Sequence, residues 1–135
     1  MWLKEAFRNR SFLKNLKARD DAKEILNTLR NGKRNHKLIY WTTRPSLLNR
    51  LTIQSLERNK LPFDRIYYIN RGHACESKLK IVGREKVNTI IESNSEIIES
   101  LRKKCQTIIF DTPYNKECIR GKRIYGWKDL EFMIA

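Results

Sequence analysis

Residues Thr107-Ile108-Ile109-Phe110-Asp111-Thr112-Pro113-Tyr114-Asn115 run from an apolar segment straight into a polar one. A short run of β-branched and aromatic side chains is typical of a strand in a buried sheet. The sequence therefore predicts a strand over residues 107–111 that ends just before the proline.

Along the rest of the chain, segments with apolar residues at helical spacing alternate with short apolar segments that are typical of strands. We predict strands over residues 37–42, 65–69, 87–92 and 107–111, with a last short strand over 121–125. We predict helices over residues 74–83, 94–104 and 127–134, and one of about a dozen residues after Thr43-Arg44-Pro45-Ser46 that bears Leu47, Leu48, Leu51 and Leu56.

An earlier helix has clear start and stop signals. Asp20 or Asp21 can cap its first turn, and Asn31-Gly32 ends it. The side chains at helical spacing predict its buried face, which consists of Ala22, Ile25, Leu26 and Leu29.

The alternation of helices and apolar strands is the signature of a parallel sheet covered by helices on both faces. We therefore expect one α/β domain over residues 1–135, with three layers and a Rossmann-like sheet. Residues 1–17 form a basic N-terminal segment that we expect to be helical, with an apolar stripe between its lysines and arginines.

Composition limits the classes of protein. With 29 Lys and Arg against 15 Asp and Glu, the net charge of +14 attracts polyanions, so a nucleic acid or nucleotide is a candidate partner. The same charge also suits an ordinary solvated surface. The longest apolar runs are far shorter than the roughly 18 residues that span a bilayer, so we expect a cytoplasmic protein with no membrane partner. Three widely spaced cysteines predict no disulfide framework and no zinc site.

Four segments in order carry a family resemblance: residues 38–45, 77–80, 89–96 and 108–115. With Arg123 and Trp127 downstream, they resemble the second half of a haloacid dehalogenase (HAD) superfamily phosphatase. The closest likeness is to the putative nucleotidases and 5'(3')-deoxyribonucleotidases. The resemblance implies a HAD-like fold that lacks the first, motif-bearing strand, so that the chain is N-terminally truncated and degenerate.

Carried over by position, the resemblance assigns phosphate contacts to three residues. Thr42 looks like the hydroxyl of the second motif and Lys78 like the lysine of the third, while Arg44 could add a bidentate contact. Without the resemblance, Thr42 and Thr43 would simply cap the next helix, and Lys78 would be a solvated helical residue.

Two departures from the family pattern argue against catalysis. No Asp-x-Asp, the family's nucleophile pattern, occurs in the chain. The fourth motif reads Glu92-Ser93-Asn94, with serine where the family's magnesium-binding aspartate stands. We therefore expect no catalytic residues, no Mg²⁺ or other cofactor, and a Glu92 that forms an ion pair with Lys78.

The missing strand also has a structural consequence, because unpaired ladder edges are costly. We predict that residues 37–42 and 87–92 pair directly and close the gap. The alternative is that another chain, including a second copy in a homodimer, fills it.

Three functions remain open. The first is a non-catalytic HAD-like pseudoenzyme that binds and regulates a protein partner, a product expected by analogy from phages and mobile elements. The second is a phosphate, nucleotide or nucleic-acid binder that uses Thr42, Arg44 and Lys78. The third is a 5'-nucleotidase-type phosphatase completed by a partner chain.

Overall fold

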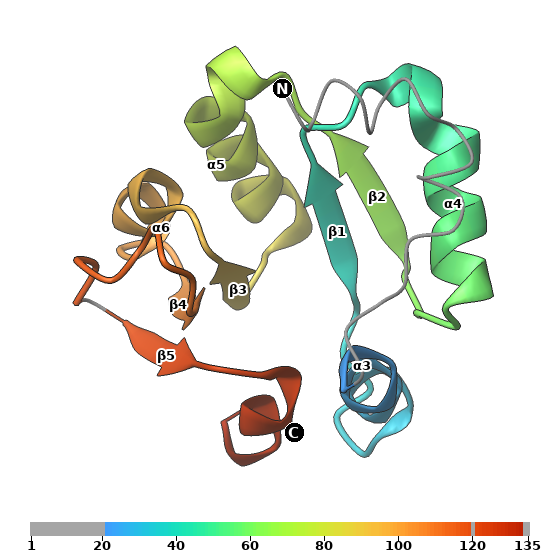
Figure 1. The fold of residues 1–135 in the computed structure, drawn as a ribbon. Helices are drawn as coiled ribbons and strands as arrows, with labels where there is room; N and C mark the ends of the chain where they lie inside the picture. The colour runs from blue at the N-terminus through green and yellow to red at the C-terminus, as the bar shows by residue number, and fades with distance from the viewer. Residues whose placement is uncertain (1–20, 120, 134–135) are drawn as a thin grey trace. The chain divides into compact units, whose positions relative to one another are not determined.

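A computed structural model describes residues 21–119 and 121–133, which form mixed α/β structure with parallel strands (Figure 1). The predicted N-terminal helix over residues 1–17 lies outside the described residues. The chain forms two compact units, one containing residues up to Tyr68 together with the chain from Glu131, the other spanning Ile69–Leu130. Each unit has its own small parallel sheet. The α/β class with parallel strands is thus confirmed, whereas the strands form two sheets rather than one.

The first unit begins with α3 (Ala22–Asn31), whose four predicted core residues are between 1% and 6% exposed. The helix ends where its stop signal predicts. A Cβ at Gly32 would lie 2.6 Å from the carbonyl oxygen of Thr28, so the residue after the helix must be small.

Two parallel strands form the sheet of this unit. β1 (Ile39–Thr42) and β2 (Arg65–Tyr68) pair from Ile39 opposite Arg65 to Thr42 opposite Tyr68, and η1 (Ser46–Leu48) and α4 (Asn49–Arg58) connect them. β1 is half-buried along its length. The predicted helix after Pro45 begins as the 3₁₀ turn η1, which contains Leu47 and Leu48; Leu48 is buried, whereas Leu47 is 87% exposed.

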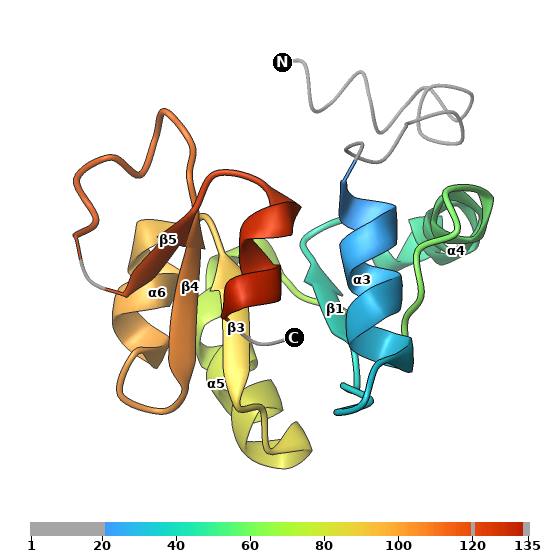
Figure 2. The same cartoon turned by 90° about the horizontal axis from the view of Figure 1, so that it is seen from below.

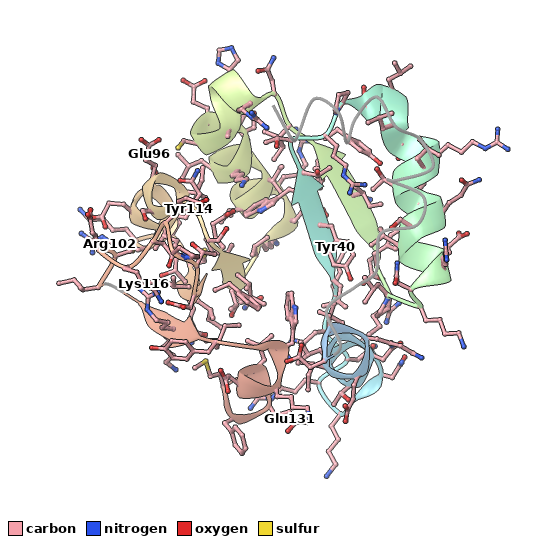
Figure 3. The ribbon with its side chains drawn as sticks, in the orientation of Figure 1. Tyr40, Glu96, Arg102, Tyr114, Lys116 and Glu131 are labelled. Atoms are coloured by element: carbon pink, nitrogen blue, oxygen red, sulfur yellow. The ribbon has the colours of Figure 1, made fainter. Side chains whose placement is uncertain are left out.

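Asp64 ties this sheet to α3. Its side chain accepts a hydrogen bond from the Leu38 backbone N–H at 2.7 Å and pairs with Arg30 at 2.8 Å. Tyr40 (Figure 3) donates its hydroxyl to the Pro62 carbonyl at 2.6 Å. Burial, with the nearby charge of Asp64, raises the pKa of Tyr40 to about 12, so this hydroxyl remains a donor.

The second unit holds a three-stranded parallel sheet in the order β3 (Thr89–Glu92), β4 (Gln106–Phe110), β5 (Lys122–Ile124). After η2 (Arg71–His73), α5 (Ala74–Glu85) and α6 (Ser95–Leu101) cover one face, and η3 (Trp127–Phe132) begins on the other (Figure 2). Thr107 to Phe110 are all buried, as expected for a strand covered on both faces. Gly121 enters β5 with φ +94°, and a Cβ there would lie 2.9 Å from the Thr107 hydroxyl.

Element ends differ from the prediction by one to three residues, with local causes. The α6 helix begins at Ser95 because Asn94 is its N-cap, accepting the backbone N–H of Glu96 and Ile97 at 2.9 and 3.3 Å. The predicted closing helix is instead a 3₁₀ segment that starts at Trp127.

In the described part of the chain, β1 pairs with β2 and β3 pairs with β4. In both cases a strand pairs with the next strand along the chain, because a short connection costs less loop-closure entropy than a long one. The predicted pairing of β1 with β3 would join the two units and stays a prediction.

Candidate functional site

A buried ion pair lies at the carboxyl end of β3. The Lys78 Nζ, on α5, lies 2.7 Å from Glu92 Oε2, and their side chains are 9% and 11% exposed. The other oxygen, Glu92 Oε1, accepts the backbone N–H of Ser93 at 3.1 Å and of Asn94 at 3.3 Å. The predicted ion pair is confirmed, and the alternative of a solvated Lys78 was wrong.

A second paired carboxylate follows β4. Asp111 contacts Arg123 Nη1 through Oδ1 and Lys116 Nζ through Oδ2, both at 2.7 Å. The hydrogen bond from Lys116 lowers the pKa of Asp111 despite the opposing effect of desolvation, and Arg123 lowers it further. Asp111 is therefore ionised near neutral pH and engaged by two cations.

Asn115 fixes the loop after β4, and sequence reasoning missed this role. Its side chain is 1% exposed and donates to the carbonyls of Ser93 at 2.9 Å and Phe110 at 2.8 Å. Its Oδ1 accepts the backbone N–H of Thr112 at 3.0 Å. A single amide thus holds the loop against the ends of both β3 and β4.

Arg123, on β5, completes this arrangement. Besides Asp111, its guanidinium donates to Asn115 Oδ1 at 3.0 Å, to the Asn115 carbonyl at 3.1 Å and to the Cys118 carbonyl at 2.6 Å. Trp127 packs on Phe110 with ring centroids 5.3 Å apart. Asn115 and Arg123, two of the residues that carried the resemblance, therefore fix the loop over residues 112–119; we call their contacts the clamp. The order of Asn115 and Arg123 in the family-like motif was the sequence feature that could have pointed to this arrangement.

The clamped loop presents apolar side chains to solvent. Tyr114 (Figure 3) is 95% exposed. Ile119 is 89% exposed, although the backbone between the two residues is held by Asn115 and Arg123. A fixed backbone with exposed aromatic and aliphatic side chains is the form of many protein-binding surfaces.

Thr42 and Arg44 lie in the first unit, at the carboxyl end of β1. The Thr42 hydroxyl accepts the Arg44 backbone N–H at 3.1 Å, and Arg44 donates to the buried Thr52 hydroxyl at 3.4 Å. Thr42 thus closes the turn after its strand; the N-cap position of the next helical turn is Pro45. Because Lys78 belongs to the other unit, a phosphate site made by all three residues stays a prediction.

The residues at the carboxyl ends of β3 and β4 do not fit a magnesium site. Glu92 is engaged by Lys78, Ser93 supplies no charge, and Asp111 is engaged by Arg123 and Lys116. Over residues 21–119 and 121–133, no cluster of three or more His, Cys, Asp or Glu is placed to hold a metal ion. No disulfide joins Cys75, Cys105 and Cys118 in the described part of the chain.

No helix within the described residues has the length and apolar character needed to cross a membrane. Comparison with family models, with curated proteins and with solved structures finds no match to this chain. The resemblance to HAD phosphatases therefore rests on the four sequence segments.

Proposed function

We propose that this chain is a non-catalytic binding protein, a degenerate HAD-like frame that regulates a protein partner. The observation that carries the proposal is the pairing of the two carboxylates that follow β3 and β4. Glu92 is neutralised by Lys78, and Asp111 by Arg123 and Lys116. A carboxylate held in this way is a poor nucleophile and a poor metal ligand, because its lone pairs and its charge are already engaged.

The positions of the four segments support the HAD-like part of the proposal. Thr42 ends β1, Glu92 ends β3, Asp111 follows β4 and Lys78 lies on α5, next to Glu92. Ligands of parallel α/β sheets bind at such strand ends. Each unit therefore keeps a strand end of the kind that binds phosphate. The residues that would perform chemistry are replaced, as at Ser93, or paired, as at Glu92 and Asp111.

The clamped loop supports the binding part of the proposal. Exposed aromatic residues on a rigid backbone lose little conformational entropy on binding and are enriched among residues that dominate interface energies. Tyr114 is such an exposed aromatic residue, and Ile119 adds an exposed aliphatic side chain to the same loop.

We expect the purified chain to release no phosphate from p-nitrophenyl phosphate or nucleoside monophosphates above buffer background, with or without Mg²⁺. The physical reason is the absence of an unpaired carboxylate nucleophile at the strand ends described above. A malachite-green assay measures this directly. Activity that copurifies with the chain and disappears in Asp111→Asn or Glu92→Gln, provided that variant stays folded, would refute the non-catalytic proposal.

We expect affinity purification from the native cell, followed by mass spectrometry, to recover one protein in stoichiometric amount. Truncating the two exposed side chains in Tyr114→Ala/Ile119→Ala should reduce its recovery at least about tenfold, as expected when hot-spot residues worth about 2 kcal/mol are removed. Leu47→Ala/Phe132→Ala is the matched control, because those side chains are 87% and 90% exposed. Equal loss in both variants, or loss in Thr42→Val alone, would contradict a partner site on this loop.

A further inference from the structure

Positively charged residues are concentrated at the amino ends of the strands in the second sheet, opposite the carboxyl ends described above. The helices α5 and α6 also end on this side of the sheet. Thr89 of β3 lies opposite Gln106 of β4, and Lys122 opens β5 two positions further along β4, opposite Ile108. The last turns of α5 and α6, the loops that follow these helices and the start of β5 contain six cations: Arg84, Lys86, Arg102, Lys103, Lys104 and Lys122. All are exposed except the half-buried Arg102.

Few acids offset this charge. The same segments contain only Glu85 and Glu99, and Glu99 pairs with Arg102 at 2.8 Å. Six cations against two acids leave an excess of four positive charges on one edge of a unit of about sixty residues. We call this set of six cations the amino-edge patch.

The dipoles of α5 and α6 account for only part of the patch. A cation near the C-terminus of a helix is favourable, and this effect falls off within the last turn. Arg84 lies in the last turn of α5, whereas the other five cations follow a helix or lie on β5.

Lys86 offers a position in the patch where charge can be removed without backbone strain. It is the C-cap of α5 with φ +53°, in the left-handed region that glycine or asparagine usually occupies in this position. Lys60, outside the patch, has a similar φ of +54°, so the conformation by itself does not indicate binding.

We propose that the amino-edge patch binds the phosphate backbone of a nucleic acid. The segments start neighbouring strands about 4.8 Å apart, a spacing close enough for several cations to contact consecutive phosphates of one strand. Of the large apolar side chains that are exposed in the described part of the chain, Ile119 lies close in sequence to the patch, three residues before Lys122. A single aliphatic side chain is far less than the apolar face by which amphipathic segments bind a lipid surface. This inference does not rest on the protein partner proposed above.

The test is fluorescence anisotropy of the full chain with a short labelled single-stranded RNA and a short labelled duplex DNA over a range of salt concentrations. We expect wild type to bind at least one of them, and Lys103→Glu/Lys104→Glu to bind at least about tenfold more weakly near physiological salt. The slope of log affinity against log salt should fall by about one for each lost phosphate contact.

Two further variants separate the patch from net charge and from folding. Lys23→Glu/Lys33→Glu makes the same charge change at exposed positions of the first unit and should weaken binding less than about threefold. Lys86→Gly should weaken binding several-fold while the melting temperature stays the same or rises, because glycine suits φ +53°. Equal weakening by both double variants, no binding by wild type, or stronger binding to phosphatidylserine vesicles than to either nucleic acid would overturn the proposal.

Discussion

Replacing Lys78 with alanine is expected to lower the free energy of unfolding by about 3–5 kcal/mol, the cost of leaving a buried charge without its partner. Lys78 Nζ and Glu92 Oε2 lie 2.7 Å apart, with both side chains close to nine-tenths buried. In Lys78→Ala the carboxylate keeps its two backbone donors from Ser93 and Asn94 but loses the cation that pairs with it at 2.7 Å. Urea denaturation followed by circular dichroism measures the change.

Lys80→Ala is the matched control, because Lys80 lies on the same helix two residues away and is exposed. It should change the free energy of unfolding by less than about 0.5 kcal/mol. The double variant Lys78→Met/Glu92→Leu should be more stable than Lys78→Ala, because apolar groups of similar size need no counter-charge. A Lys78→Ala protein as stable as Lys80→Ala would show that the pair contributes nothing to folding.

This result would change how binding experiments on Lys78 are interpreted. In the HAD resemblance Lys78 neutralises a phosphoryl group, yet in the structure its charge is engaged by Glu92. A loss of phosphate or nucleotide binding in Lys78→Ala is evidence for a ligand contact only if the variant is still folded at the assay temperature. Thr42→Val is the cleaner probe of a residual anion site, because it removes one hydroxyl on the half-buried end of β1.

Local patterns in the sequence predicted most of the elements, because the physics behind them is local. The buried face of α3 follows from helical spacing of four apolar residues, and the apolar runs at 89–92 and 106–110 become strands. The start of the helix after Pro45 differs from the prediction, since a proline-led 3₁₀ turn that contains Leu47 precedes α4.

The partners of the strands and the contacts of the clamp could not be predicted from local patterns in the sequence. The pairing of β1 with β2 joins residues that are twenty-six positions apart, such as Ile39 and Arg65, which no local periodicity records. Asn115 is a polar residue that becomes buried through contacts with Ser93, Phe110 and Arg123, from three different strand ends. Similarly, the burial of Lys78 depends on a carboxylate fourteen positions away.

Replacing Arg123 with alanine is expected to lower the free energy of unfolding by about 3 kcal/mol, from its hydrogen bonds to Asn115 and Cys118 alone. The variant leaves the side-chain oxygen of Asn115 with one donor and two loop carbonyls without their guanidinium donor. Arg123→Lys should recover less than half of the loss, since an ammonium cannot spread its donors across three acceptors as the planar guanidinium does. Lys122→Ala, at the exposed neighbouring position, is the control and should be nearly neutral.

The same variants connect the clamp to the proposed binding loop. If Arg123 holds residues 112–119, then Arg123→Lys should increase proteolysis of that loop and reduce capture of the protein partner even at temperatures where the rest of the chain is folded. A variant that loses stability but keeps full capture would separate the clamp from partner binding.

The dependence of stability on acid pH provides an independent check on the ion pairs of Asp111. Because hydrogen bonding to Lys116 and Arg123 lowers the pKa of Asp111, its contribution to stability is complete above the ordinary carboxyl value of 3.8 and is lost as the pH falls below it. Asp111→Asn should remove that part of the acid dependence, measured as the urea midpoint against pH, and a wild-type profile unchanged by the substitution would show that the Asp111 ion pairs do not stabilise the loop.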